Sequence, residues 1–456
     1  FREWINNQKR DYYHLHQSET DPDAIIIENE YCYSYVTFNP QCIIELCVMN
    51  KRTDEMAFYL HFQFKTLKHA ISLFEEMDQC IKKMIDQPIC RLLLCCSGGM
   101  TTAFFADKIK NGIKVLNLNM EVAATSYQKI YNVAQNYDVI LLAPQVSYVK
   151  LQVEKVFKNK LVLKIPTQIF ASYNVGALIT FVEESLKHKE NKYNGYVEPL
   201  ASMMEIKTNK NVLAVSINAN GENSHISYRL YNLHQDIVLD SNIIKSNIKL
   251  QDVLDALDTV VLQNEMIDVI SIALPGVMVE GNIYSGIIEG GNHQLKERLE
   301  KRYEKEIYLI NDVNAAVVGY YASQTEYKSL AFLFQPIGRM AGSGIVVNGQ
   351  LVRGMDHLAG EVALLPLKLS DSYLNLANTP EGTLELVTKN IMSIIAIVSP
   401  EAIVVYSDLI LDSQDVSDEI KKSLSQYSLK VYPKIIKVEN ILEYILLGAM
   451  ILSAKE

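Results

Sequence analysis

The segment from Arg91 to Ile109 constrains the fold of this chain more than any other. The apolar run at residues 91–94 predicts a buried strand, and residues 103–109 predict a helix. Between them stand Cys95, Cys96 and a turn of small and polar residues. The sequence therefore predicts a strand that ends in a thiol, followed by a glycine-bearing turn and the N-terminus of a helix.

This turn suits an anion. Backbone N–H groups of the turn and of the first helical turn have no partner within the helix, and the helix dipole favours negative charge there. The same field favours the thiolate, which is the nucleophilic form of cysteine. Cys96 is therefore a candidate phosphoryl acceptor. The alternative is a buried, inert cysteine, since free cysteine behaves as a small hydrophobic residue.

The motif also resembles a known family. Residues 96–102 resemble the Cys-x-x-Gly-Met-Ser/Thr-Ser/Thr loop of lactose/cellobiose-type IIB components of the bacterial phosphotransferase system. Residues 137–148, with Pro-Gln-Val at 144–146, are similar to its second signature, and residues 165–182 resemble its last strand and helix. The resemblance covers residues 89–188. It implies that a IIA partner phosphorylates Cys96, that Cys95 faces the core, and that the phosphate is held by Ser97, Gly98, Gly99, Met100, Thr101 and Thr102.

Composition narrows the possible functions. With 456 residues, the chain is expected to form about three domains. Its net charge of −10 argues against direct binding of nucleic acid, which requires a basic face. No uncharged apolar run is long enough to span a membrane, and no signal peptide is evident. The chain starts at Phe1 rather than Met, which leaves room for a further N-terminal segment.

The seven cysteines all lie within the first 96 residues and follow no disulfide or zinc pattern. A reducing cytoplasm is the expected compartment.

Four regions are predicted along the chain. Residues 1–88 are expected to form a small β-rich domain, with strands at 24–27, 31–38, 41–49 and 56–64 and a helix at 68–84. Residues 89–188 alternate strand and helix, which predicts a parallel sheet. Residues 189–204 are polar and predict a linker. Residues 205–456 predict a larger α/β domain, with strands at 211–217, 267–273, 306–310, 328–334, 343–347 and 402–405, and helices at 250–263, 295–304, 314–322, 384–397 and 415–425.

Most of residues 210–456 resemble the ROK family of sugar kinases and repressors. The likeness is carried by a Pro-Gly turn at 275–276, an Asn-Asp-x-Asn-Ala motif at 311–315, a glycine loop and hairpin at 338–354, a Gly-Glu pair at 360–361 and a late strand at 399–405. It implies an actin-like, two-lobed fold. The expected fold class is therefore an α/β multi-domain chain with a small α+β N-terminal domain, a IIB-like parallel-sheet domain and a ROK-type domain.

The ROK resemblance implies a sugar pocket. It places Asp312 at the position of the carboxylate base and assigns sugar binding to Asn311, Asp312 and Glu361. Phosphoryl transfer to a sugar hydroxyl requires such a base. Asp312 could instead cap the helix that begins near Val313, because Asp is a common N-cap residue, and both roles are compatible.

Other parts of the ROK pattern are missing. Where the family has Asp-x-Gly-Gly-Thr, this chain has Asn218-Ala219-Asn220-Gly221-Glu222, and Met340 and Ala341 stand in the second glycine loop. A Gly-His pair is replaced by Ala363-Leu364, and no cysteine follows position 96, so the family's zinc cluster is absent. We therefore expect neither zinc nor bound Mg-ATP, and no ATP-dependent kinase activity.

The sequence predicts a sugar-responsive regulatory protein. Cys96 would report phosphotransferase activity, and the kinase-like domain would bind a small sugar or sugar phosphate. Three alternatives remain open at this point: a IIB sugar phosphotransferase, an ATP-dependent ROK sugar kinase, and a protein in which both domains are inert scaffolds for oligomerisation. The expected partners are a IIA component and, because ROK-like folds often associate, a second copy of the chain. Any link to transcription rests on the repressor branch of the family.

Overall fold

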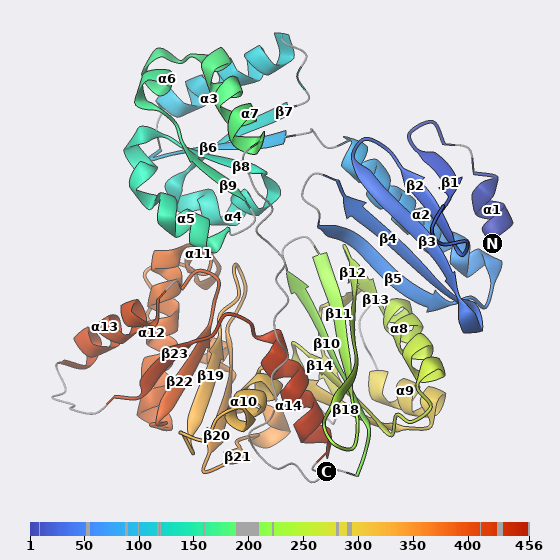
Figure 1. Cartoon of the computed structure of the whole chain (residues 1–456). Helices are drawn as coiled ribbons and strands as arrows, with labels where there is room; N and C mark the ends of the chain where they lie inside the picture. The colour runs from blue at the N-terminus through green and yellow to red at the C-terminus, as the bar shows by residue number, and fades with distance from the viewer. Residues whose placement is uncertain are drawn as a thin grey trace.

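The computed structural model describes most of the chain: residues 1–8, 10–51, 55–86, 90–98, 100–115, 118, 120–157, 160–187, 209–220, 223–279, 282–289, 294–410, 412–425 and 432–454. The expected linker at 189–204 lies outside these residues. Figure 1 shows a small α/β unit at the upper left, a strand-rich unit at the upper right and two lobes below. These are the α/β multi-domain architecture and the kinds of unit that the sequence predicts.

The upper-left unit is built on four parallel strands in the order β7-β6-β8-β9. They are β6 (Cys90–Cys96), β7 (Met120–Ser126), β8 (Val139–Leu142) and β9 (Leu161–Lys164). Helices α3 (Met100–Val115), α6 (Thr167–Ser172) and α7 (Val175–Lys187) lie on one side of the sheet, and α4 (Ile130–Val133) and α5 (Lys150–Val156) lie on the other (Figure 1). Strand β6 pairs with β7 along its whole length and with β8 at residues 92–95, and as a central strand covered by helices on both faces it is buried almost throughout.

The strand-rich unit and the first lobe share one ten-stranded sheet. The antiparallel meander predicted for residues 1–88 is present as β2 (Ala24–Glu28), β3 (Cys32–Asn39), β4 (Ile43–Asn50) and β5 (Met56–Gln63), and it is extended by β1 (His14–Gln17), which was not predicted. The lobe continues the sheet with β12 (Ile237–Lys245), β11 (Asn223–Tyr231), β10 (Val212–Asn220), β14 (Val269–Leu274) and β18 (Glu306–Asn311). Tyr59 of β5 pairs with Ile244 of β12, so the meander extends the sheet of the lobe.

One apolar core underlies this sheet. It includes Phe62 and Phe74 from the N-terminal residues and Leu213 and Val253 from the lobe, all of them buried. Helix α2 (Leu67–Asp86) contributes to it beside α8 (Leu250–Gln263) and α9 (Leu295–Tyr303). Residues 1–88 and the first lobe thus share both sheet and core, a connection that the sequence does not predict.

The second lobe contains a five-stranded sheet in the order β21-β20-β19-β22-β23. Its strands are β19 (Leu330–Phe334), β20 (Gly342–Val347), β21 (Gln350–Leu351), β22 (Ala402–Tyr406) and β23 (Lys434–Lys437), and its helices are α11 (Tyr373–Leu376), α12 (Pro380–Ile397) and α13 (Ser413–Leu424). Shorter elements elsewhere are α1 (Arg2–Asn6), β13 (Ile248–Lys249), β15 (Val277–Val279), β16 (Asn282–Tyr284) and β17 (Ile288–Glu289).

Helices α10 (Asp312–Ala322) and α14 (Leu442–Ala454) cross between the two lobes. Their backbones touch at Gly319 and Gly448, where a Cβ on Gly319 would clash with the carbonyl oxygen of Tyr444 and one on Gly448 with that of Ala315. This crossing holds the two sheets in one core.

We predict that Gly448→Ala destabilises the protein, although alanine is the better helix former by about 1 kcal/mol. The new methyl group must push the two helices apart, and overpacking of this kind typically costs about 1–3 kcal/mol. Urea unfolding measures the change. Gly176→Ala in α7 is the control, because a Cβ there meets nothing closer than Asn174 Oδ1 at 3.7 Å. A gain in stability for Gly448→Ala would contradict this account of the crossing.

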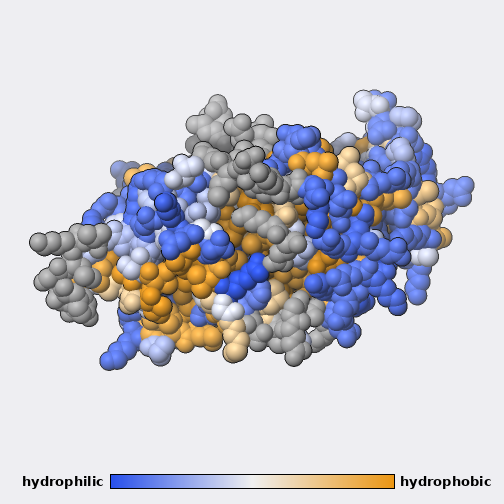
Figure 2. Space-filling model, turned by 90° about the horizontal axis from the view of Figure 1, so that it is seen from below, coloured by the Kyte–Doolittle hydropathy of each residue, from blue (hydrophilic) through white to orange (hydrophobic). Residues whose placement is uncertain are grey.

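Figure 2 shows the lower face of the lobes: hydrophilic residues dominate on the right, and an apolar area gathers on the left, on the side of the second lobe. Among the described residues, no helix has both the length and the apolar character needed to cross a membrane.

Candidate functional site

Cys96 ends the central strand of the parallel sheet. From β6 the chain crosses to β7 on one side, and from β7 it returns to β8 on the other. The carboxyl end of β6 is therefore the point where the strand order reverses, and open α/β sheets bind their ligands in the crevice at this point. Cys96 stands at this end of β6, and only 6% of its surface is exposed.

The turn after Cys96 directs a backbone donor at the thiol. The N–H of Gly98 donates to Cys96 Sγ at 3.2 Å, and Sγ lies 3.8 Å from the carbonyl oxygen of Thr125 at the end of β7. Gly98 has a φ of +100°, a conformation that side chains disfavour, so glycine allows the tight reversal of the chain here. The turn therefore presents a backbone hydrogen-bond donor to the Cys96 sulfur.

The rest of the predicted phosphate cradle is described in part. Ser97 is exposed beside Cys96. Helix α3 begins at Met100, three residues before the predicted start at 103, so the backbone N–H groups of Met100, Thr101 and Thr102 belong to its first turn. Gly99 and the side chains at 100–102 lie outside the described residues.

Cys95 differs sharply from Cys96. It is fully buried in the sheet, and burial raises its thiol pKa to about 12. Cys95 therefore stays protonated near neutral pH, as expected for a cysteine that faces the core. Although the two thiols are adjacent in sequence, only Cys96 lies at the end of the strand.

This crevice lies near the second lobe. Tyr127 follows β7 directly, and its hydroxyl donates to Glu381 Oε1 at 3.2 Å, in the first turn of α12. Leu409, which follows β22, is buried in the apolar core of the β6–β9 unit, and Ile337 packs against that core. Nothing in the sequence indicates these contacts. Glu381 is an acidic residue in the first turn of a helix, where acidic residues are common without any contact to another domain.

The second predicted site lies at the start of α10. Helix α10 begins at Asp312, and its N-cap is Asn311, whose Oδ1 accepts the N–H groups of Val313 at 3.1 Å and Asn314 at 3.0 Å. The suggestion that Asp312 caps a helix starting near Val313 is therefore wrong, although Asp312 Oδ1 also accepts the Val313 N–H at 2.9 Å. Because Asn311 Nδ2 donates to the Gly276 carbonyl oxygen at 3.0 Å, this side chain fixes the Pro-Gly turn against the helix.

Asp312 and Glu361 are electrostatically coupled. Asp312 is 6% exposed, and its pKa is raised to about 6, mainly by burial, with the negative charge of Glu361 adding to the effect. Burial also raises the pKa of Glu361, which is half-buried. A carboxyl group that titrates near physiological pH is suited to general acid–base chemistry or to hydrogen bonding of sugar hydroxyls.

Asp312→Asn should make the stability of the protein less dependent on pH. The pKa of Asp312 is higher in the folded protein than in the unfolded chain, so its stabilising contribution is present below about pH 4 and is lost as pH rises through about 6. We therefore expect the variant to be more stable than the wild type at about pH 8 and nearly equal at about pH 4. Thermal unfolding across this range measures the difference. A constant difference at every pH would contradict the buried, titrating carboxyl group.

Backbone N–H groups of the second glycine loop, residues 338–344, form hydrogen bonds with neighbouring residues of the same lobe. The N–H of Gly338 donates to the Ala377 carbonyl oxygen at 2.9 Å, and the N–H of Ala341 donates to the Tyr373 hydroxyl at 3.2 Å. Met340, between them, is 47% exposed. Sequence reasoning missed Tyr373 as a brace for this loop, because no local pattern connects it to a segment more than thirty residues earlier.

The segment that stands in place of the family's Asp-x-Gly-Gly-Thr loop, residues 218–222, joins β10 to β11. Asn218 pairs with His225 in the hairpin, and Asn218 Nδ2 lies 3.5 Å from Ser216 Oγ. Gly221 and Glu222, at the tip, lie outside the described residues. In the part of the chain that the structure describes, no group of three or more His, Cys, Asp or Glu residues could hold a metal ion.

Two family models match the sequence. The model of the ROK family matches residues 220–372, and the model described as PTS system, Lactose/Cellobiose specific IIB subunit, matches residues 91–180. No curated protein matches this sequence.

Solved structures of both kinds are similar to parts of the chain. A ROK family protein from Streptococcus pneumoniae TIGR4 in complex with sucrose is 19% identical, with a TM-score of 0.44, over 53% of this chain and 97% of that one. A ROK family transcriptional regulator, a homologue of the E. coli MLC protein, is 14% identical with a TM-score of 0.40, over 54% and 80%. The lactose-specific IIB component domain from Streptococcus pneumoniae is 23% identical with a TM-score of 0.19, over 21% and 95%.

The two family-model matches fall on the two units whose sites are described above, one on the β6–β9 sheet with Cys96 and the other on the lobes around Asp312. This chain is therefore a fusion of a phosphotransferase-system lactose/cellobiose-type IIB domain with a ROK family domain.

Proposed function

We propose that this protein is a cytoplasmic, sugar-responsive regulator that combines two signals. Cys96 of the IIB domain would accept a phosphoryl group from a IIA component. The ROK domain would bind a sugar or sugar phosphate around Asp312 and Glu361 without ATP-dependent turnover. All seven cysteines are free, which is consistent with a reducing compartment.

The position of Cys96 carries this proposal. Its Sγ lies at the switch point of the sheet and accepts the Gly98 N–H. In the proposed step, the Cys96 thiolate attacks the phosphorus atom held by the IIA component. The S–P bond forms as the bond from phosphorus to the IIA component breaks, so the phosphoryl group moves without any further reactant. Gly98 N–H and the first turn of α3 would then face the phosphoryl oxygens.

The braced loop supports binding without turnover. A nucleotide phosphate needs free backbone N–H groups and an open glycine backbone. In the second loop, Gly338 and Ala341 donate instead to Ala377 and Tyr373. Met340 stands where the family pattern has glycine, and Ala341 next to it also adds a side chain to the loop. Asn218 stands where the family has a metal-holding carboxylate, so the residues present fit Mg-ATP poorly.

The contact between the domains supports a connection between the signals. Tyr127 is adjacent to Ser126, which pairs with Cys96 in the sheet, and Tyr127 donates to Glu381 at the start of α12. Just before this helix, Asn378 lies against Gly338 of the second loop. A dianionic phosphoryl group on Cys96 would change the electrostatic environment of this contact.

The experiment that tests the proposed function is phosphoryl transfer in vitro. The protein is incubated with phosphoenolpyruvate, the general phosphotransferase proteins and a cellobiose-type IIA component, and the modified residue is then mapped by mass spectrometry. We expect one phosphoryl group, on Cys96. A folded protein that stays unmodified beside an active IIA component would refute the role of Cys96.

One observation favours a second function, that of an ATP-dependent ROK sugar kinase. Asp312 is a buried carboxyl group with a raised pKa, which is the character of a general base. ADP release measured with a panel of hexoses at millimolar Mg-ATP separates the two functions. Sugar-dependent turnover that is lost in Asp312→Asn would establish the kinase, whereas sugar binding without turnover is the result expected of the regulator.

A further inference from the structure

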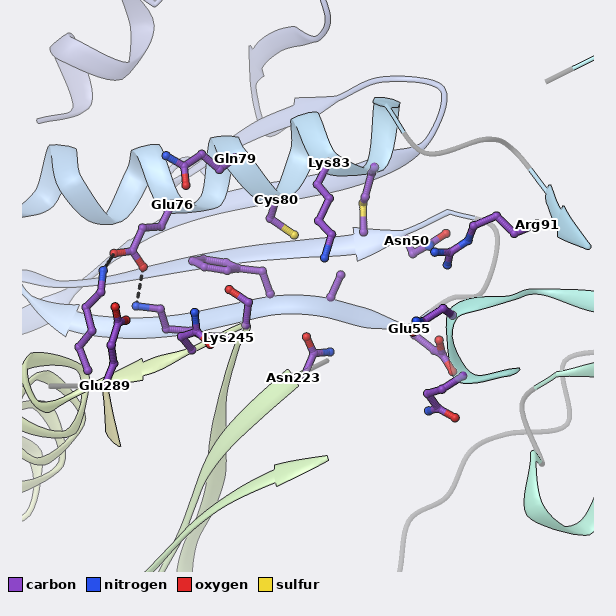
Figure 3. A pocket seen from close by; sticks show the side chains of 18 of the residues that line it. Asn50, Glu55, Glu76, Gln79, Cys80, Lys83, Arg91, Asn223, Lys245 and Glu289 are labelled. Carbon is purple, nitrogen blue, oxygen red and sulfur yellow. Dashed lines mark hydrogen bonds and ion pairs between the residues drawn. The ribbon is translucent and has the colours of Figure 1, made fainter. Parts of the chain in front are cut away.

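We propose that a neutral sugar, of mono- or disaccharide size, binds in a pocket between the N-terminal residues, the first ROK lobe and the IIB domain. The pocket has a volume of about 610 Å³, within the range of small-molecule sites. Figure 3 shows Gln79 and Lys83 on α2 above it, Lys245 and Glu289 at one end and Arg91 of the IIB domain at the other. None of the residues assigned above to the Cys96 or Asp312 sites lines it.

Five basic side chains line the pocket, and three of them have carboxylate partners: Arg91, Lys245 and Lys249. Lys245 is 3% exposed and forms ion pairs with Glu76 and Asp252, both at 2.5 Å. Glu76 also accepts from Lys249 at 3.2 Å, and Arg91 lies 3.7 Å from Asp138. Lys83 and Lys160, which also line the pocket, have interactions of their own. Since every basic side chain of the lining is already engaged, the pocket does not favour an added anion.

The remaining polar lining suits hydroxyl groups. Six residues with amide side chains line the pocket, and they come from all three parts of the protein: Asn50, Gln79, Gln135, Asn136, Asn223 and Asn247. An amide both donates and accepts hydrogen bonds, as each hydroxyl group of a sugar does. Phe58, Ala57 and Met84 add apolar surface that can pack against the C–H face of a sugar ring.

The Glu76–Lys245–Asp252 network fixes one end of the pocket. Asp252 Oδ2 also accepts the Lys249 N–H at 2.7 Å, so the network joins α2, β12 and the start of α8. A site held in this way needs little rearrangement to bind a ligand. Because Arg91, Gln135, Asn136 and Lys160 belong to the IIB domain, a bound sugar would connect that domain to the other two parts of the protein.

The test uses the full chain carrying Asp312→Asn and Glu361→Gln, which disables the proposed ROK sugar site and leaves the pocket intact. Calorimetric titration with glucose, cellobiose and lactose at millimolar concentrations measures binding. Gln79→Trp and Asn136→Trp, added separately, fill the pocket from α2 and from the IIB domain. Both positions are exposed. Ser72→Trp is the control, because it introduces the same side chain at an exposed position of α2 outside the pocket.

We expect at least one of these sugars to bind the background variant, with affinity reduced about tenfold or more by each pocket-filling substitution and unchanged by Ser72→Trp. Thermal unfolding confirms that the compared variants are folded. Absence of binding by all three sugars would overturn the proposal, and so would binding that survives both filling substitutions. Sugar binding in this pocket does not involve Cys96, so a negative result in this titration would leave the phosphoryl-transfer test unaffected.

Discussion

Replacing Cys96 by serine is expected to abolish phosphorylation of this protein, whereas replacing Cys95 by serine is expected to leave it intact. A serine hydroxyl at position 96 stays protonated at neutral pH and is a far weaker nucleophile than a thiolate. Cys95 is fully buried, and its thiol pKa of about 12 keeps it uncharged. The two substitutions alter neighbouring sulfur atoms of the same strand, so they form a matched pair.

The measurement is transfer of labelled phosphate from phosphoenolpyruvate through an active IIA component, followed over time for each variant. Thermal unfolding shows whether either serine disturbs the sheet, and Cys95→Ala serves as a second form of the control. Loss of labelling in folded Cys95 variants, or labelling that persists in Cys96→Ser, would contradict the assignment of Cys96 as the phosphoryl acceptor.

Arg229→Met should destabilise the ROK domain by about 3–5 kcal/mol. Arg229 lies on β11 with 3% of its side chain exposed, and it donates to both carboxylate oxygens of Glu443 on α14, at 2.8 and 3.0 Å. It also pairs with Asp240 of β12 at 2.8 Å. Removal of the guanidinium group leaves the Glu443 carboxylate, 7% exposed, without its buried partner.

The double variant Arg229→Met/Glu443→Leu distinguishes an unpaired charge from lost packing. Replacement of a buried ion pair by apolar side chains is often nearly neutral, so the double variant should recover most of the loss. Urea unfolding of the wild type, both single variants and the double variant gives the coupling between the two residues. A double variant as unstable as Arg229→Met would show that the buried charge is not the cause.

Local patterns predicted the parts of this structure that depend on local chemistry. The buried strand before Cys96 and the turn after it follow from an apolar run and glycine, whereas α3 begins three residues earlier than the predicted 103. Helix α14 was not predicted, because it is apolar on every side and shows no 3.6-residue period. Its burial against α10 requires Gly319 and Gly448 to meet, which only the tertiary structure reveals.

Strand pairing between segments far apart in the chain could also not be predicted from the sequence. Strands β11 and β12 were not predicted, and β12 is the strand that receives β5 from the N-terminal meander. At the sites, resemblance to two families made Cys96, Asp312 and Glu361 candidates, and the structure adds that the last two are electrostatically coupled. It could not identify Tyr127 and Glu381, because their contact joins two domains across more than 250 residues.

The central claim, that one chain combines two sugar signals, is tested most directly by the effect of Cys96 phosphorylation on sugar binding. Calorimetry compares the phosphorylated and unphosphorylated wild type with the sugar that the unphosphorylated protein binds most tightly. We predict a change in affinity of about fivefold or more, as is typical of coupled sites, and a smaller change in Tyr127→Phe, which lacks the hydrogen bond to Glu381. Equal affinities of the two wild-type forms would contradict the account.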